Sequence, residues 1–473
     1  MKHNLLAAAA ALGLFLGGAT AASAQPLSIT KVWTFEHTTA GQVSEIPAFD
    51  PKTRTVWVAG VTGVDVIDLA SGSLVDHIDV TPWGMVNSVA IRNGIAALAV
   101  EAVPDRRQDG RVIFLDTKTR ALAAGISEVS VGPLPDMLVF SPDGERLLVA
   151  NEGTPNAVAD TAYTTPDPAG SVTIINAITR TVIATATLAG VPQYGSNLRT
   201  NTGMDFEPEY IAFEPGGRRA FVTLQEGNAV GVLDLQVKSF TAIVGLGAKD
   251  FSVAGNEIDT VDNDAVVNFL PVPAFGLYMP DAIAAFKHRG QTYLVTANEG
   301  DYREDNVDRS AASTFGAVAP LNRLRVSNTD SAPGQLYAAG ARSFSIWGDN
   351  GNLVFDSGNI LEREADARGI YDDGRSRDKG VEPEGVVLQT IGQRRYAFIG
   401  LERTKSSAVA VFDITDPYNA TFVDMIVTPG DLAPEGLAAF EAPGGFYLAI
   451  ANETLAAGAA GTHTTLYRIR PKN

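Results

Sequence analysis

The chain has 473 residues, 45% of them hydrophobic, with 46 glycines and 25 prolines spaced between short apolar runs. This composition is typical of a large all-β protein with many turns. The absence of cysteine excludes disulfides, thiolate metal sites and a cysteine nucleophile. The net charge of −18 argues against nucleic acid and anionic lipid as partners.

The first 24 residues have the pattern of a secretory signal peptide. A basic start is followed by an apolar stretch from Leu5 to Ala22 and by the small-residue sequence Ala22-Ser-Ala24. A retained membrane anchor is the alternative. No later run approaches the roughly 18 apolar residues needed to span a bilayer. The sequence therefore predicts a signal peptide over residues 1–24 and one soluble domain, periplasmic or secreted, over residues 25–473.

The rest of the chain repeats one pattern, in which an acidic residue opens a first apolar run and a second acidic residue ends the next run. In chain order the opening residues are Glu45, Ser88, Asp136, Glu209, Asp281, Glu384 and Glu435, and the closing residues are Gly60, Glu101, Glu152, Glu226, Glu299, Glu402 and Glu453. A third strand and a short turn follow most copies. Repeats of four strands and roughly 40 residues predict a β-propeller, here with seven WD40/YVTN-like blades.

The seventh copy lacks a fourth strand, because the chain stops at Asn473 just after the run Thr465–Ile469. The segment Ser28–Trp33 precedes the first copy and belongs to no repeat. We expect this N-terminal strand to pair with the last run and to close the ring in the last blade. Closure would leave only short, protected strand edges.

The connections between the predicted strands are of two kinds. Turns between first and second strands, and between third and fourth strands, are short. The long connections cover residues 153–170, 190–207, 249–279, 300–341 and 356–382. In an up-and-down four-stranded unit these long connections emerge on one face, which is therefore predicted to carry the function.

Both acidic residues of each repeat are expected on that face, around the mouth of the central channel. Like charges gathered in a partly desolvated funnel need compensation, so we expect a cation there. Carboxylates without thiols and with little imidazole favour Ca²⁺, with Mg²⁺ or Mn²⁺ as alternatives. Each carboxylate could instead accept backbone hydrogen bonds at a strand end. The predicted metal ligands are Asp136, Glu152, Glu209, Glu226, Asp281, Glu299, Asp301, Glu384, Glu402, Glu435 and Glu453.

Basic residues in the same loops are candidates for holding an anionic substrate beside the cation. The predicted substrate-binding residues are Arg303, Arg342 and Arg403, and Arg377 and Lys379 are further basic residues of these loops. A guanidinium can bind two oxygens of one anion, whereas pairing with neighbouring carboxylates is the alternative. The histidines are scattered and no Gly-x-Ser-x-Gly motif is present. Metal-activated water is therefore the chemistry left for a hydrolase.

Several long motifs resemble those of the choice-of-anchor I family. They include Gly276-Leu-Tyr-Met-Pro-Asp-Ala-Ile-Ala284, Thr296-Ala-Asn-Glu-Gly-Asp301, Lys379-Gly-Val-Glu-Pro-Glu-Gly385 and Ala397-Phe-Ile-Gly-Leu-Glu-Arg403. The resemblance covers essentially the whole chain after the signal peptide. It implies a secreted bacterial β-propeller, similar to an echinoderm mesenchyme-specific cell-surface glycoprotein and to atypical alkaline-phosphatase-like proteins. Members often end in an anchoring segment, and none is seen here, which suggests a free periplasmic or secreted protein.

Two functions are compatible with these features. The first is a Ca²⁺-dependent phosphoric-ester hydrolase, similar to an alkaline phosphatase or phytase, acting on an anionic small molecule at the channel mouth. The second is a non-catalytic binding or adhesion propeller, stabilised by Ca²⁺, that binds a surface protein or glycan. A monomer is expected in both cases.

Overall fold

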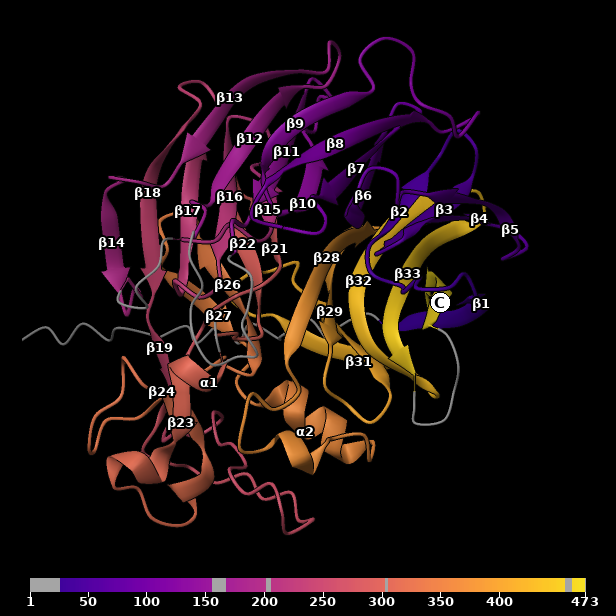
Figure 1. Ribbon diagram of the computed structural model, residues 1–473. Coiled ribbons are helices and arrows are strands. Elements are labelled where there is room, and N and C mark those ends of the chain that lie inside the picture. The colour runs from indigo at the N-terminus through magenta and orange to yellow at the C-terminus, as the bar shows by residue number, and fades with distance from the viewer. Residues whose placement is uncertain (1–25, 155–166, 201–205, 303–304, 456–461, 473) are drawn as a thin grey trace, which may run out of the picture.

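The computed structural model describes residues 26–154, 167–200, 206–302, 305–455 and 462–472, and the predicted signal peptide lies outside them (Figure 1). The fold is all-β, as predicted from the repeats. Within the described ranges its α-helices are α1 (Asp305–Asp308) and α2 (Ile360–Ala367). Neither of them is long and apolar enough to cross a membrane.

Seven sheets of four or five strands make up most of the described structure. Sheet 1 contains β2 (Pro47–Asp50), β3 (Thr55–Gly60), β4 (Gly63–Asp68) and β5 (Leu74–Asp79), and sheet 2 contains β6 (Met85–Arg92), β7 (Ile95–Glu101), β8 (Asp109–Asp116) and β9 (Glu128–Pro133). Sheet 3 contains β10 (Pro135–Phe140), β11 (Arg146–Asn151), β12 (Ser171–Asn176) and β13 (Thr181–Thr187). Sheet 4 contains β15 (Ile211–Phe213), β16 (Arg219–Leu224), β17 (Ala229–Asp234), β18 (Ser239–Leu246) and the added parallel strand β14 (Gln193–Ser196).

The remaining three sheets follow the same antiparallel order. Sheet 5 contains β21 (Ile283–His288), β22 (Gln291–Asn298), β26 (Ser343–Gly348) and β27 (Leu353–Asp356), and sheet 6 contains β28 (Pro383–Ile391), β29 (Arg394–Leu401), β30 (Ser407–Asp413) and β31 (Thr421–Thr428). Sheet 7 contains β32 (Asp431–Ala442), β33 (Gly445–Leu455), β34 (Thr462–Pro471) and β1 (Leu27–His37).

Neighbouring sheets pack face to face, which explains why their middle strands are almost entirely buried. All six residues of β3 are buried, because both faces of the strand are covered. Hydrophobic clusters fill the spaces between successive sheets from sheet 1 to sheet 7. A further cluster joins Val56 and Val58 of sheet 1 to Tyr447 and Leu466 of sheet 7. The first strands β2, β6, β10, β15, β21, β28 and β32 contact one another in that order, and β32 contacts β2.

The N-terminal strand β1 pairs antiparallel with β34 at the outer edge of sheet 7, beside the yellow C-terminal strands in Figure 1. Ser28 lies opposite Arg470 and Ile29 opposite Ile469, so the predicted pairing of the two terminal segments is confirmed. The strand also reaches sheet 1, because the indole N–H of Trp33 donates to the carbonyl of Leu69 at 2.9 Å.

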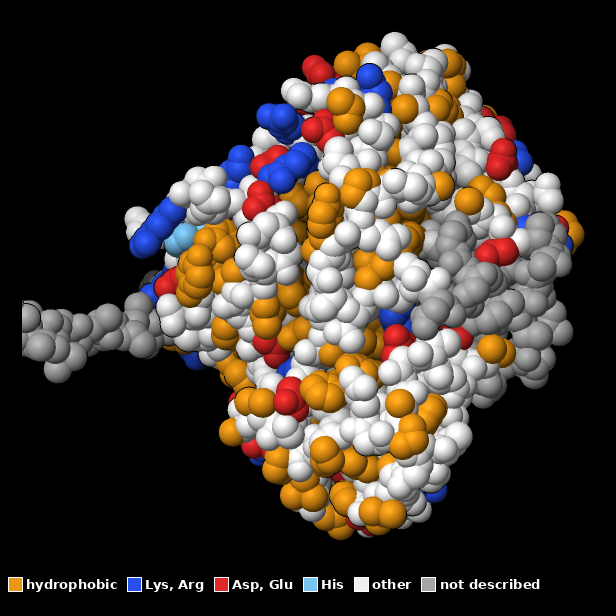
Figure 2. All heavy atoms as spheres, turned by 90° about the vertical axis from the view of Figure 1, so that its left-hand side faces the viewer, with side chains coloured by type: hydrophobic (Ala, Val, Ile, Leu, Met, Phe, Trp, Pro, Cys, Tyr) orange, Lys and Arg blue, Asp and Glu red, His pale blue; other side chains and the backbone are white. Residues whose placement is uncertain are grey.

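The long connections 249–279, 300–341 and 356–382 form an insertion lobe below the sheets in Figure 1. The lobe contains strands that the repeat pattern does not predict. They are β19 (Ala248–Asp250), β20 (Phe275–Leu277), β23 (Arg309–Ala311), β24 (Arg325–Ser327) and β25 (Tyr337–Ala339), with short 3-10 turns at Ala312–Phe315, Leu321–Arg323 and Asp373–Arg375. Phe251, Val326 and Leu336 belong to its own hydrophobic core. Figure 2 shows hydrophobic side chains at several places on the lower part of the molecule.

Two glycines that follow acidic residues allow the first strands of neighbouring sheets to approach closely. A Cβ atom on Gly436 would lie 2.1 Å from the carbonyl oxygen of Glu45, just before strand β2 of sheet 1, whereas one on Gly385 would lie 3.1 Å from that of Glu435. Gly436→Ala should therefore force sheets 7 and 1 apart and lower the free energy of unfolding by about 2–3 kcal/mol. Gly385→Ala should cost less than about 1 kcal/mol. Urea denaturation of both variants checks this, and equal losses would contradict it.

Candidate carboxylate site

A repeated backbone conformation positions the acidic residue at the start of several first strands. Leu134, Met279, Glu382 and Ala433 each precede a proline and have positive φ angles of 45°, 42°, 50° and 48°. Positive φ is uncommon for residues other than glycine, so its recurrence at equivalent positions marks a shared local geometry. In each case the acidic residue follows the proline directly.

A β-bulge accompanies this conformation in three of the sheets. The strand register shifts between Pro135 and Leu138, between Pro383 and Val386, and between Pro434 and Leu437. Bulges alter the direction in which side chains point and are common beside functional sites. They occur here at the three acidic residues Asp136, Glu384 and Glu435, all of which line one cavity.

This cavity, which we call the carboxylate cavity, has a volume of about 560 Å³ and lies where the first strands meet. The acidic side chains that line it are Glu45, Asp136, Glu152, Glu209, Glu226, Asp281, Glu299, Asp301, Glu382, Glu384, Glu402 and Glu435. Its basic side chains are Arg106, Arg309, Arg375, Lys379 and Arg403. Every predicted metal ligand except Glu453 therefore contributes to the lining. Carboxylates outnumber the basic groups by twelve to five, so the cavity has an excess of negative charge.

Burial and mutual repulsion shift the protonation of these carboxyl groups. Burial, followed by repulsion from Glu435, raises the pKa of Glu45 to about 9. Burial and Glu152 raise the pKa of Asp136 to about 8, and burial and Glu453 raise the pKa of Glu435 to about 7. The pKa values of Glu209, Asp281, Glu384 and Glu402 are also raised well above the usual range, with burial as the largest cause. The raised pKa values of Glu45 and Asp136 favour the protonated form of these two carboxyl groups at neutral pH unless a cation replaces the protons.

Three groups of carboxylates are compact enough to hold a metal ion. Within each group the nearest carboxylate oxygens all lie within 4.8 Å of one another. The groups are Asp281–Glu299–Glu384, Glu299–Glu382–Glu402 and Glu384–Glu402–Glu435. Glu384 belongs to two of them, and its Oε2 atom is buried without a hydrogen-bond partner. A buried carboxylate oxygen without a hydrogen bond is costly. Glu382 Oε2 is another such atom, but the ammonium of Lys379 lies 3.1 Å from it, so Glu384 is the stronger candidate for a metal ligand.

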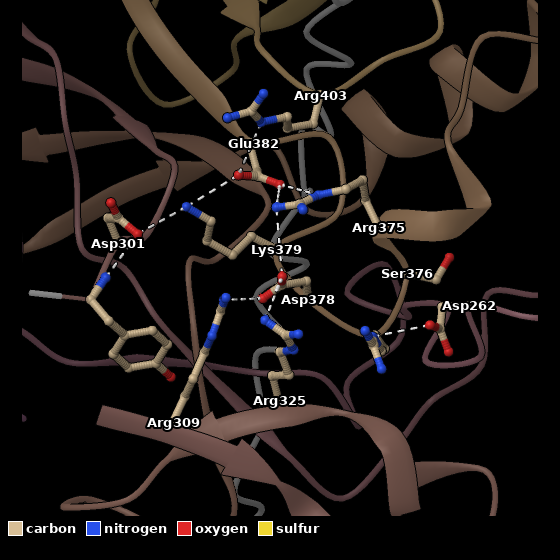
Figure 3. A network of polar contacts seen from close by, with 12 residues as sticks. Asp262, Asp301, Arg309, Arg325, Arg375, Ser376, Asp378, Lys379, Glu382 and Arg403 are labelled. Atoms are coloured by element: carbon tan, nitrogen blue, oxygen red, sulfur yellow. Dashed lines mark hydrogen bonds and ion pairs between the residues drawn. The ribbon is translucent and has the colours of Figure 1, made fainter. Parts of the chain in front are cut away.

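The group around Glu382 already contains a protein cation (Figure 3). The ammonium nitrogen of Lys379 lies 2.9 Å from Glu299 Oε1, 3.1 Å from Glu382 Oε2 and 3.2 Å from Asp301 Oδ1. Arg375 donates from Nε to Glu382 Oε1 at 2.7 Å. These contacts raise the pKa of Lys379 well above its usual range against the opposing effect of burial.

Two of the three arginines predicted to bind substrate lie in the described part of the chain, and of these Arg403 lines the cavity. Its Nη2 atom lies 2.6 Å from Glu402 Oε1, and 45% of its side chain is exposed, so it remains accessible to a ligand. Arg303 lies outside the described residues. The expectation for Arg342 is wrong for a physical reason. Its side chain is 1% exposed, and its guanidinium donates to the carbonyls of Ser376 at 2.7 Å and Asp378 at 2.8 Å.

Several residues of the site could not be identified from the sequence. Glu382, Arg309 and Arg375 line the cavity although no repeat or spacing rule marks them. The sequence marks Lys379 and Arg377 alike as basic residues of one loop, but Arg377 turns away from the cavity and its Nε atom pairs with Asp262 at 3.0 Å. The sequence shows that this loop is rich in basic residues, but it does not show which of them reach the cavity.

The described histidines do not line the cavity. The His37 imidazole lies within hydrogen-bond distance of two side chains: Nδ1 is 2.6 Å from Asp65 Oδ2 and Nε2 is 2.8 Å from Thr464 Oγ1. The Thr464 hydroxyl in turn lies 2.8 Å from the Ser44 hydroxyl. This chain of hydroxyl, imidazole and carboxylate is buried, so a substrate has no access to it. It ties β1 to sheets 1 and 7 and is a structural network.

The comparisons with known proteins concern the family and the fold. Residues 45–417 match the model of the choice-of-anchor I domain. The comparison with curated proteins finds no match. Among solved structures, the chain is similar to hydrazine synthase of Kuenenia stuttgartiensis, with a TM-score of 0.51, 12% identity, and coverage of 89% of this chain and 97% of the other. It is also similar to a chain in a crystal structure of the mitotic checkpoint complex, with a TM-score of 0.53, 10% identity, and coverage of 99% and 100%. At these identities the similarity shows a propeller-like fold alone.

Proposed function

The chain belongs to the choice-of-anchor I family, and from this premise we propose that it is an exported β-propeller whose carboxylate cavity binds Ca²⁺ together with an anionic small molecule. The family indicates a cell-surface or extracellular protein. The signal-like residues 1–24 support export to the periplasm or the exterior.

We propose that the seven sheets are the blades of one closed propeller. The cyclic contacts of the first strands and the apolar cluster between sheets 7 and 1 support this arrangement. The pairing of β1 with β34 supports closure by the N-terminal strand in the last blade. A closed ring would leave few exposed strand edges, which suits a large protein without disulfides.

The cation proposal rests on the buried, unpaired Oε2 atom of Glu384, which belongs to the group completed by Glu402 and Glu435. The donor atoms fit Ca²⁺, because the lining offers carboxylate, amide and hydroxyl oxygens, and the chain has no thiol. Asp281 is a further carboxylate grouped with Glu384, whereas Glu299 of the same group already accepts hydrogen bonds from Lys379 and Gln225. Mg²⁺ and Mn²⁺ use the same donor atoms and are the alternatives.

The proposed reaction is the hydrolysis of a phosphoric ester. When bound, the cation would polarise a phosphoryl oxygen and lower the pKa of a water molecule. Arg403 is placed to orient the anion, since it lies at the cavity wall with part of its guanidinium exposed. Asp136 has a pKa of about 8, so its carboxyl group is suited to exchange a proton near neutral pH.

A non-catalytic binding propeller is the second candidate. The observation that favours it is the lining itself, which contains no histidine among the described residues and whose basic groups largely pair with carboxylates. In that case the cation would stabilise the cavity, and the insertion lobe would contact a protein or glycan.

Phosphate release from p-nitrophenyl phosphate separates the two candidates. We expect turnover with Ca²⁺, its loss on chelation, and at least about a tenfold decrease in kcat/KM in Arg403→Ala, because one charged contact to the anion is removed. The control is Arg394→Ala, which removes an arginine that pairs with Asp413 outside the cavity lining. Ca²⁺ binding without phosphate release would reject the hydrolase and favour the binding propeller.

A further inference from the structure

We propose that Lys379 is a resident cation of the carboxylate cavity, which occupies the Glu299–Glu382–Glu402 group and directs the divalent cation to the Glu384–Glu402–Glu435 group. The inference rests on the proposed function. It further specifies how many divalent cations bind and which carboxylates bind them. It assigns to Lys379 the role of a specificity-determining residue.

The contacts of Lys379 are those of a cation held by several carboxylates. Its nitrogen lies within 3.2 Å of oxygens from Glu299 and Asp301, which follow β22, and from Glu382 of its own loop. Figure 3 shows the contacts with Asp301 and Glu382. Only 8% of its side chain is exposed, and Glu382 is 1% exposed. Charge-assisted contacts of this length, shielded from water, compensate the negative charge of the group. A divalent cation would have to displace this ammonium to enter the same group.

The loop that carries Lys379 is fixed independently of its side chain. The guanidinium of Arg342 donates hydrogen bonds to the backbone carbonyls of Ser376 and Asp378, which lie in the loop just before Lys379. Gly380 follows Lys379 with φ of +69°, and a Cβ atom there would lie 2.3 Å from Glu362 Oε1. Arg342 is therefore a positioning residue for Lys379. Because the ammonium is tethered, its effective concentration beside the carboxylates is high and dissolved Ca²⁺ competes poorly for them.

The neighbouring group has no such ammonium. Glu384 Oε2 is buried and has no hydrogen-bond partner, although the side chain is 9% exposed and lines the cavity. Arg403 contacts this group at one atom of Glu402, at 2.6 Å, and is half-exposed. A cation should bind most favourably where a buried oxygen without a hydrogen bond lies beside two further carboxylates, because binding there satisfies that oxygen and offsets the negative charge. We therefore infer one divalent cation, bound by Glu384, Glu402 and Glu435, none of which is in direct contact with the Lys379 ammonium among the ion pairs of the described residues.

Calorimetric titration of the purified protein with CaCl₂ tests the inference. Wild-type protein should bind one Ca²⁺ with high affinity. Lys379→Met should bind a second Ca²⁺, or bind the first at least about tenfold more tightly, because a positive charge beside the site is removed. Lys379→Arg keeps the charge and should retain one site at near wild-type affinity.

Lys249→Met is a matched control for the loss of a buried lysine. Lys249 is 3% exposed and pairs with Asp356 at 2.8 Å, away from the residues that line the carboxylate cavity. The Lys249→Met variant should bind Ca²⁺ with the same stoichiometry and affinity as the wild type. A gain of a second site in Lys249→Met as well would overturn the assignment to Lys379.

A second pair of variants keeps the test decisive if Lys379→Met fails to fold. Glu382→Gln removes a negative charge beside the site but no ligand, so it should lower Ca²⁺ affinity by about tenfold at most. Glu435→Gln removes a ligand and should lower the affinity at least about thirtyfold. Equal losses in the two variants would overturn the resident cation. Unchanged stoichiometry and affinity in a folded Lys379→Met would do the same and leave the proposed function standing. Ca²⁺ binding by Lys379→Met but not by wild type would support the resident cation and reject the proposed wild-type Ca²⁺ site.

Discussion

Chelation at pH 8 should lower the melting temperature of the protein by about 3 °C relative to protein in Ca²⁺ at one hundred times its dissociation constant. A ligand at that excess that binds only the folded state stabilises it by about 2.7 kcal/mol. The unfolding entropy of a chain of this length converts this free energy into a shift of about 3 °C. Calorimetric melting in chelator and in Ca²⁺ measures it.

The size of this shift should depend on pH in a defined direction. The folded state raises the pKa values of Glu45 to about 9, Asp136 to about 8 and Glu435 to about 7, whereas an unfolded carboxyl group titrates near 4. Between these values the folded state binds more protons than the unfolded state. The metal-free protein should therefore lose stability as the pH rises from about 4 through 7 to 9, and the stabilisation by Ca²⁺ should increase over the same range.

The double variant Glu384→Gln, Glu435→Gln tests whether these carboxylates are the cause. It keeps side-chain size while removing two charges, so it should lose the response to Ca²⁺ and show a metal-free melting temperature at pH 8 that is equal to or higher than that of the wild type. Glu441→Gln is the matched control, because Glu441 lies on the same strand β32 but is exposed to solvent. Normal Ca²⁺ binding by the double variant would contradict a cation at this site.

Deleting residues 25–36 should destabilise the protein more strongly, by at least about 5 kcal/mol, and promote aggregation. The deletion removes the backbone pairing of β1 with β34 and the packing of Ile29, Trp33 and Phe35. It also leaves the edge of β34 free to pair with another chain. Thermal melting and light scattering measure the two effects.

The control for this deletion is a chain that begins at Gln25 and so lacks only the predicted signal peptide. We expect its free energy of unfolding to equal that of the protein that still has residues 1–24. A synthetic peptide of residues 26–37, added to the deleted protein, should restore part of the melting temperature by pairing with β34. Unchanged stability after the deletion would show that β1 does not hold sheet 7 and sheet 1 together.

The sequence alone determined the features that repeat within short stretches of chain. The acidic residue, the apolar run and the tight turn recur with most of the sheets. The all-β fold, the placement of Asp136, Glu384 and Glu435 at one cavity, and the pairing of the two terminal strands could therefore be predicted. Each of these follows from local geometry or from one missing strand. The outlying case is Glu453, which was predicted to line the cavity, does not do so, and influences Glu435 by charge alone.

The tertiary structure decided which basic groups meet those carboxylates. Lys379 contacts Glu299, 80 residues away, and Arg342 holds the Lys379 loop from 34 and 36 residues away, because the insertion lobe folds on its own hydrophobic core. Sequence spacing carries no information about contacts made when such a lobe packs back onto the sheets. Four basic residues that look alike in the sequence have different surroundings in the structure. Arg342 is buried, and Arg377 pairs with Asp262 outside the cavity. Lys379 contacts three carboxylates, and Arg403 is partly exposed at the cavity wall. The charge balance of the cavity is therefore a property of the folded chain, since it depends on distances and burial that arise only when the lobe and the sheets are packed together.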